Sequence, residues 1–275
     1  MAYLCISLLT ALAKSQITHI PLLELIFLRY LVPCLLFWWI QLNIQKPIKP
    51  RHHLPHIMRG IVLLLSQYSL FYCIAHNTLL NSMLLMMTSS FFIPLLRYKT
   101  EPLPLRTLLA IGTGFTGVVL ILHPNAALFN WPALAGVFSG FCIAISAIIM
   151  QKQVTSDSAN THILYTYNVS TVISFIVLIS FNHHAALGIH IDTLYHNHTI
   201  LILLLMGILS ISNQALKGIG YQRVTQLNRV APLAYSTVIF AGLLDWGIYG
   251  QTPGTLAYVG AALIVCSGIS VSLNK

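Results

Sequence analysis

Three charged residues lie inside long apolar runs, where a charge is expensive unless it has a partner or a function: Arg29, Lys217 and Asp245. On insertion scales, a charge at the centre of a bilayer costs about 2.5–3.5 kcal/mol. Arg29 either reaches the interface, pairing with Glu24, or faces the protein interior and binds an anionic group. Lys217 either reaches the interface or lines a cavity. Asp245 caps a helix, pairs with a neighbour, or couples proton binding to a conformational change.

A second group of residues in the apolar runs is polar but uncharged. Amides and hydroxyls in an apolar environment need hydrogen-bond partners. Bonds between helices meet that need, and a polar cavity between helices is the alternative. The candidates for lining such a cavity are Gln67, Tyr68, Tyr72, Ser89, Ser90, Asn213, Gln214, Tyr235 and Ser236.

The composition identifies the environment that must hold these residues. Of the 275 residues, 57% are hydrophobic and 7% are charged, whereas about a quarter are charged in ordinary soluble domains. A soluble enzyme and a disordered chain are therefore excluded. Since a span needs about 20 apolar residues, the sequence predicts an all-α integral membrane protein with roughly ten spans.

The apolar runs indicate where these helices lie, because such a run satisfies its backbone in lipid only as a helix. The predicted spans are 1–17, 20–42, 57–75, 79–96, 104–122, 131–150, 161–181, 199–220, 227–248 and 254–273. Lys and Arg concentrate in alternate loops and their flanks, with Arg59 expected at the flank of the 45–56 loop and Lys14 as the one exception. By the positive-inside rule, both termini are cytoplasmic. We expect a multi-pass protein of the cell inner membrane, with the 182–198 loop outside.

The two halves of the sequence resemble each other. A shift of 147 residues places Gly60 on Gly207, Gln67 on Gln214, Asn81 on Asn228 and Ser89 on Ser236. The halves are residues 1–123 and 124–275, with five predicted spans each. Because five is odd, the second half enters the membrane from the opposite side. Inverted repeats of this kind are typical of secondary transporters, whose substrate site lies near the midplane between the halves.

Several segments resemble the EamA type of the drug/metabolite transporter superfamily. They are Pro21–Arg29, His56–Gly60, Met86–Pro94, Gly114–Pro124 and Ala231–Ala241. The resemblance implies ten helices, cytoplasmic termini and transport of small metabolites by alternating access. His56-Ile-Met-Arg59-Gly60 is also similar to S-adenosylmethionine transporters. The chain departs from the family in its short first helix, whose native start is left open, and in Gln251, where the family often has Glu.

Other chemistry finds little support in the sequence. The chain has no Walker sequence, HExxH or GxSxG motif, so neither ATP hydrolysis nor enzymatic catalysis is indicated. No nucleic-acid module, cofactor site or metal site is predicted, although histidines crowd the 182–198 loop. His52, His53 and His56 are expected to join the basic cytoplasmic surface.

The sequence thus predicts a secondary-active carrier of a small organic metabolite, with membrane lipid and a coupling proton as further partners. The alternatives are an S-adenosylmethionine-type uptake carrier, a non-transporting sensor or subunit, and an integral-membrane enzyme. Substrate, direction of transport, coupling ion and oligomeric state are left open.

Overall fold

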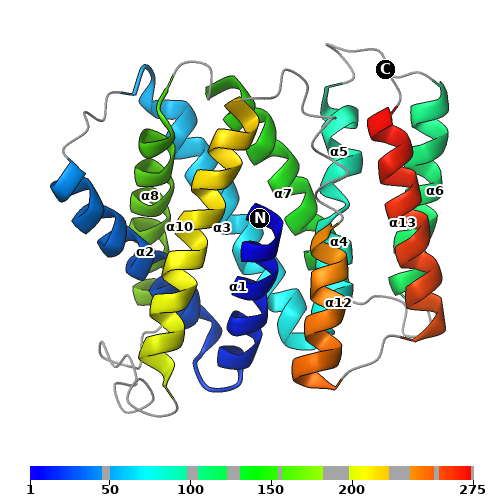
Figure 1. Cartoon of the computed structure of the whole chain (residues 1–275), viewed down its shortest axis with the longest axis horizontal. Helices are drawn as coiled ribbons and strands as arrows, with labels where there is room; N and C mark the ends of the chain where they lie inside the picture. Colours follow the sequence, from blue (N-terminus) through cyan, green and yellow to red (C-terminus); the bar gives the residue numbers. More distant parts are fainter. Residues whose placement is uncertain are drawn as a thin grey trace.

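Helices make up the secondary structure that the computed structural model describes (Figure 1). The description covers residues 1–44, 50–97, 105–122, 131–153, 157–181, 198–222, 236–250 and 254–273, and no strand occurs among them. This confirms the all-α prediction. The helices are α1 Ala2–Ile17, α2 Leu22–Ile44, α3 His53–His76, α4 Leu79–Met86, α5 Ser89–Leu96, α6 Leu105–Leu122, α7 Trp131–Gln153, α8 Ala159–Phe181, α10 Thr199–Gln222, α12 Ser236–Tyr249 and α13 Thr255–Leu273.

Among the described residues, six segments are long and apolar enough to cross a membrane: α2, α3, the combined α4–α5 segment, α7, α8 and α10. Three shorter apolar helical segments cover Ala2–Ile17, Thr237–Tyr249 and Tyr258–Ser267. Large apolar side chains face outward, as Trp39 and Phe181 do with exposed fractions of 68% and 76%. Such outward-facing apolar surface is stable only in lipid or against another apolar surface, so the chain is a multi-pass membrane protein.

The predicted span 79–96 is interrupted. α4 ends at Met86, α5 begins at Ser89, and tight turns between them connect Thr88 N–H to Leu85 O at 3.2 Å and Ser90 N–H to Met87 O at 3.0 Å. Gly140 of α7 lies against this break, since a Cβ there would approach Met86 O to 2.9 Å. The absent side chain lets α7 approach the backbone closely.

Helices from the two halves of the chain pack against one another. α3 packs mainly on α7 and α8, α1 on α10 and α12, α2 on α8 and α10, and α6 on α13. Two glycines make equivalent close approaches. A Cβ on Gly60 of α3 would meet Val169 of α8 at 2.8 Å, and a Cβ on Gly207 of α10 would meet Val32 of α2 at 2.8 Å.

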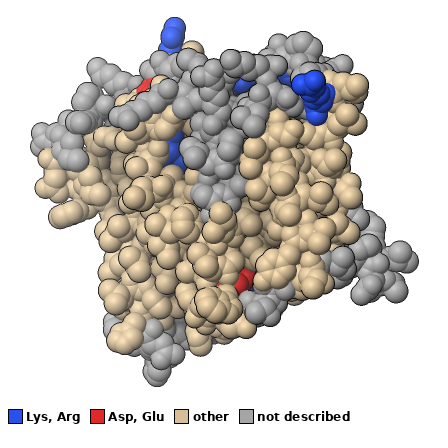
Figure 2. Space-filling view, turned by 45° about the vertical axis from the view of Figure 1, so that its right-hand side comes forward, with Lys and Arg blue, Asp and Glu red and all other residues tan. Residues whose placement is uncertain are grey.

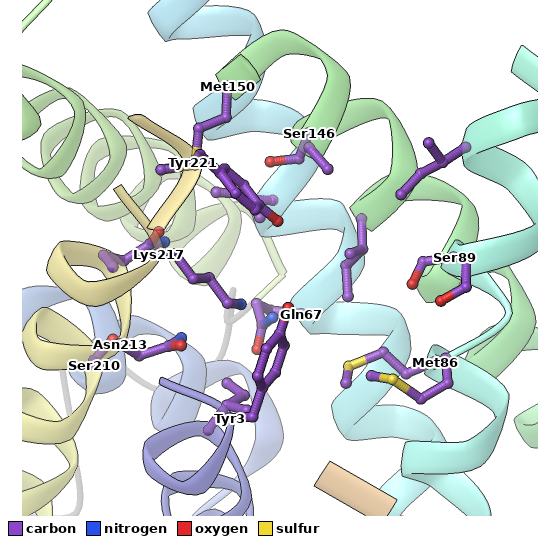
Figure 3. A pocket seen from close by; sticks show the side chains of 18 of the residues that line it. Tyr3, Gln67, Met86, Ser89, Ser146, Met150, Ser210, Asn213, Lys217 and Tyr221 are labelled. Atoms are coloured by element: carbon purple, nitrogen blue, oxygen red, sulfur yellow. The ribbon is translucent and has the colours of Figure 1, made fainter. Parts of the chain in front are cut away.

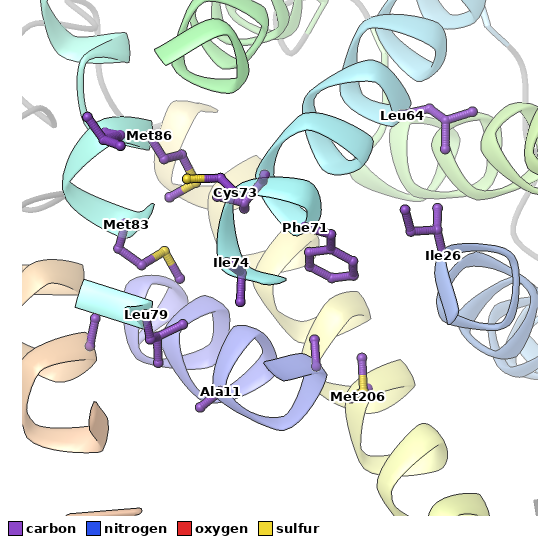
Figure 4. Packing of buried hydrophobic residues seen from close by; sticks show 14 of the residues in the cluster. Ala11, Ile26, Leu64, Phe71, Cys73, Ile74, Leu79, Met83, Met86 and Met206 are labelled. Atoms are coloured by element: carbon purple, nitrogen blue, oxygen red, sulfur yellow. The ribbon is translucent and has the colours of Figure 1, made fainter. Parts of the chain in front are cut away.

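An apolar core joins α1, α2, α3, α4 and α10 (Figure 4). Phe71 of α3 and Met83 of α4 are fully buried in it, with Ala11 of α1 and Met206 of α10 close by. This core fixes the helices whose other faces line the cavity described below.

Basic side chains gather toward one end of the molecule, the end drawn uppermost in Figure 2. Arg51, Arg106 and Lys152 are exposed beside the ends of α3, α6 and α7. The surface prediction for His56 is wrong. This side chain is only 1% exposed, and its Nε2 lies 2.7 Å from Asp157 Oδ2. The structure extends α3 by four residues beyond the predicted start, to His53, and this carries His56 into the helix bundle.

Candidate functional site

A cavity lies among α1, α2, α3, α4, α5, α7, α8 and α10 (Figure 3). It encloses about 1140 Å³ of empty space, part of which is open to solvent. Its lining consists of Tyr3, Ile6, Arg29, Tyr30, Leu63, Gln67, Met86, Met87, Ser89, Ser90, Ile93, Ile143, Ser146, Ala147, Met150, Tyr167, Ser210, Asn213, Gln214, Lys217 and Tyr221. Both halves of the chain therefore contribute to its wall.

Arg29 supplies one positive charge to the cavity wall. Its side chain is 5% exposed, and Nη1 donates a hydrogen bond to Gln67 Oε1 on α3. The guanidinium lies 4.7 Å from the centre of the Phe71 ring, a distance typical of a cation–π contact. Nε is buried without a hydrogen-bond partner. Arg29 thus faces the protein interior, and no ion pair joins it to Glu24 within the described residues.

Lys217 supplies a second positive charge. It follows Asn213 and Gln214 by four and three residues on α10, which places the three side chains on one face of the helix. In Figure 3 the Lys217 side chain extends from α10 into the cavity and points toward Gln67. Its ammonium forms no ion pair or hydrogen bond with the described part of the chain.

A third cation, Arg59 of α3, stands behind the wall. It is 3% exposed and donates to Thr166 Oγ1 of α8 at 2.7 Å and to Gln214 Oε1 of α10 at 3.1 Å. It also contacts Met150 Sδ of α7 at 3.2 Å. All three acceptors are uncharged. Arg59 therefore links four helices around the cavity, and no carboxylate in the described part of the chain pairs with it.

No acidic residue lines the cavity within the described ranges. The carboxylate of Asp245 instead lies 3.0 Å from Lys14 Nζ and accepts the Leu80 N–H at 2.6 Å. It therefore joins α12 to α1 and caps the first turn of α4. Of the roles considered for Asp245, the structure shows the pairing and the capping.

Asp157 is also engaged elsewhere. It lies between α7 and α8, where it binds His56 and accepts the Arg51 N–H at 3.1 Å. Burial tends to raise the pKa of Asp157, but the hydrogen bonds from His56 and from the Arg51 backbone outweigh it and leave the pKa below the ordinary 3.8.

Tyrosine rings and flexible methionines form much of the remaining wall. Tyr167 donates to or accepts from Ser210 across 2.8 Å, which fixes one ring between α8 and α10. Tyr3 and Tyr221 project from α1 and α10 toward the cavity (Figure 3). Met86 lies at the α4–α5 break, which also turns Ser89 and Ser90 toward the cavity. The arrangement combines adaptable apolar contacts with hydroxyl groups.

Seven of the predicted residues line this cavity: Arg29, Gln67, Ser89, Ser90, Asn213, Gln214 and Lys217. Tyr68 and Tyr72 do not, because they leave the Gln67 face of α3. Tyr72 is 39% exposed, and its ring lies 4.7 Å from that of His76 at a tilt of 50°. Tyr235 and the side chain of Ser236 fall outside the described residues, as do Gln251 and nearly all of the 182–198 loop.

The sequence reasoning missed Arg59 and four cavity tyrosines. Arg59 was assigned to the basic flank of the 45–56 loop, because the span was expected to begin at residue 57. It lies almost two turns inside α3. The sequence could have identified these tyrosines as polar groups inside apolar runs. Tyr30 follows Arg29 directly, and Tyr3, Tyr167 and Tyr221 interrupt other runs.

Residues 130–273 match the EamA-like transporter family, which is more than half of the chain. The chain belongs to this family. The resemblance stated from the sequence is thereby confirmed, and so is its assignment as a membrane transporter. This EamA-like transporter holds no group of three or more metal-binding side chains in the residues described.

Two curated relatives are similar over most of their length. The pseudopaline exporter CntI of Pseudomonas aeruginosa strain UCBPP-PA14 is 22% identical over all of this chain and 94% of its own. A riboflavin transporter of Rhizobium johnstonii is 26% identical over 82% of this chain and 72% of its own. A solved crystal structure with 18% identity superimposes with a TM-score of 0.71, covering 99% of this chain and 94% of the other. That likeness supports the fold.

Proposed function

We propose that this EamA-like transporter is a secondary-active carrier that moves a small organic metabolite across the inner membrane by alternating access. The observation that carries the proposal is the cavity, whose wall comes from α1–α5 of the first half and α7, α8 and α10 of the second. A site shared by two halves opens to one side or the other when the halves rock against each other.

The packing supports an inverted repeat of five helices per half, with ten spans in total. Exchanging the halves pairs α3 with α10 and α2 with α8. Under this exchange, the approach of Gly60 to Val169 becomes the approach of Gly207 to Val32. The contacts of α1 with α10 and of α3 with α7 are exchanged in the same way. The glycine contacts and the helix contacts are therefore both related by the same exchange of halves.

The interrupted helix supports a binding role for the cavity. Discontinuous helices at the centre of transporters present backbone groups and side chains to a substrate. Here the break between α4 and α5 adjoins Met86, Met87, Ser89 and Ser90, all of which line the cavity. The boundary between the repeats is proposed between residues 123 and 124, because five predicted spans lie on each side of it.

The names of the relatives support an organic cargo. One is an exporter of pseudopaline and the other transports riboflavin, and we extend only the class, a small organic metabolite, to this chain. The S-adenosylmethionine alternative stays a prediction, because it rests on residues 56–60 alone. Proton coupling through Asp245 also stays a prediction.

Reconstitution into liposomes tests the proposal. Purified protein should exchange a labelled metabolite for the same unlabelled compound without ATP, and a pH gradient should reveal coupling. Arg106→Gln, which removes a charge at an exposed position of α6 away from the cavity, should keep full flux. Folded protein that moves none of a broad panel of acids, amines, sugars and neutral heterocycles would support the sensor alternative.

A further inference from the structure

We infer that the cavity selects an organic anion, with its carboxylate held between Arg29 and Lys217 and its body against the tyrosine rings. The inference rests on the proposed function, because it names the substrate class of the same site. It starts from an excess of positive charge around the cavity, which the uncharged side chains of the wall cannot neutralise.

Three cations surround the cavity without a counter-ion among the residues that the structure describes. Arg29 and Lys217 line it, and Arg59 stands behind its wall. The two ion pairs formed by described residues, Lys14 with Asp245 and His56 with Asp157, lie outside the lining. A buried charge without an opposite charge is strongly unfavourable, and like charges nearby add to the cost. A bound anion removes this penalty, whereas a cation increases it.

The hydrogen bonds leave donors for such an anion. Arg29 uses Nη1 on Gln67, while its Nε is buried without a partner. Lys217 has three N–H donors and reaches into the cavity toward Gln67 (Figure 3). Hydrogen bonds from two charged donors to one carboxylate are roughly twice as strong as neutral ones. Gln67 therefore positions Arg29, and the two cations bind the ligand.

The aromatic and apolar part of the wall suits the body of the molecule. Tyr3 and Tyr221 project into the cavity, and Met86 and Met87 add flexible apolar surface. Aromatic rings favour stacking with flat groups, and methionine adapts to several shapes. The preferred ligand thus carries a carboxylate on an apolar or aromatic body.

Matched acid and amide pairs provide the binding test. Purified protein in detergent is titrated with benzoate against benzamide, nicotinate against nicotinamide, and succinate against succinamide, and the melting temperature is recorded. The acids should raise the melting temperature and the amides should not. Benzylamine should leave the melting temperature unchanged or lower it. Stabilisation by the amides or the amine, without any by the acids, would overturn the inference.

Lys217→Gln separates a binding role from a structural one. Removing an uncompensated charge should raise the melting temperature of the ligand-free protein, yet weaken benzoate binding by at least about tenfold. Arg106→Gln, at an exposed position of α6, should change neither. If Lys217→Gln lowers ligand-free stability and keeps benzoate affinity, the lysine is structural and the inference is wrong.

Different experimental results would refute the anion-site inference and the proposed carrier function. Exchange of a neutral or cationic metabolite in liposomes, with no effect of carboxylates, would keep the carrier and refute the anion site. Carboxylate binding that depends on Lys217, without exchange of any panel compound, would keep the anion site and refute the carrier. Stabilisation by chloride and phosphate equal to that by benzoate would show that the site does not recognise an organic body.

Discussion

The Lys14 ammonium on α1 and the Asp245 carboxylate on α12 form an ion pair with a nitrogen–oxygen distance of 3.0 Å. The two side chains are 13% and 1% exposed, and the Lys14 ammonium also lies 4.5 Å from the centre of the Tyr249 ring. The pair thus connects α1 to α12 through two residues that are 231 positions apart in the sequence.

Asp245→Asn should therefore destabilise the protein. Removing one member of a buried pair costs about 3–5 kcal/mol, because the other charge stays buried. Lys14→Met removes the other member of the pair and should also destabilise the protein. The measurement is the melting temperature of both variants in detergent, with Arg106→Met at an exposed position of α6 as the control. Unchanged stability, together with loss of any response to a pH gradient in liposomes, would instead favour the proton-coupling role.

We expect the α4–α5 break to depend on a glycine in another helix. Gly140→Ala would place a methyl group against Thr88 and Met86 O, and overpacking of this kind costs about 1–3 kcal/mol. Gly112→Ala in α6 is the matched control, since nothing lies within 4 Å of its Cβ position. We expect the control to be neutral or slightly stabilising. Equal melting temperatures for the two variants would show that α7 does not hold the break.

An internal carboxylate should compete with a bound one. In Gln67→Glu, the new side chain stands where Arg29 already donates to Oε1. The variant should melt at a higher temperature than the parent protein without ligand and bind benzoate at least about tenfold more weakly. Gln67→Leu is the companion variant, because it removes the hydrogen bond without adding charge. Unchanged benzoate affinity in Gln67→Glu would mean that Arg29 does not face the ligand.

Acid should weaken the contact between Asp157 and α3. Because the pKa of Asp157 lies below 3.8 in the folded protein, its ionised form contributes stability at neutral pH. That contribution is complete above the ordinary pKa and is lost as the pH falls through the lower folded value. Asp157→Asn should therefore melt below the parent protein at pH 7, and the gap should narrow below about pH 4. A constant gap down to pH 3 would contradict this account.

The orientation of the chain is open to direct measurement. Reporter fusions in the 182–198 loop should give the signal of the outer face, and fusions after residue 273 that of the cytoplasm. The expectation follows from the concentration of Lys and Arg in alternate loops. A cytoplasmic signal from the 182–198 loop would refute the proposed topology.

Local composition predicted the positions of the helices well, because a long apolar run has few other ways to satisfy its backbone. The run expected at 131–150 is helical over Trp131–Gln153, for example. The α4–α5 break was invisible, since residues 79–96 contain no glycine and the one proline, Pro94, lies beyond the break. The break packs against Gly140, some fifty residues away in the sequence.

The candidate site was predicted in part. Polar residues in apolar runs identified Gln67, Gln214 and Lys217, because lipid makes such residues conspicuous. The same reasoning placed Arg59 at the membrane interface, because the predicted span begins at residue 57. The helix begins at His53, so Arg59 lies inside it. The pairing of Lys14 with Asp245 depends on how distant segments meet, and no local pattern reports that.

The interleaved packing of the two halves also bears on how the protein is made. Residues 1–122 leave the ribosome first, yet α1 and α3 find their main neighbours in α7, α8, α10 and α12. Eight-residue helices such as α4 and α5 are marginal by themselves, and the glycine that accommodates the break between them is synthesised later. We therefore expect the first half to lack its main helix neighbours until the second half is made. Two separately produced halves should regain their structure only when expressed together.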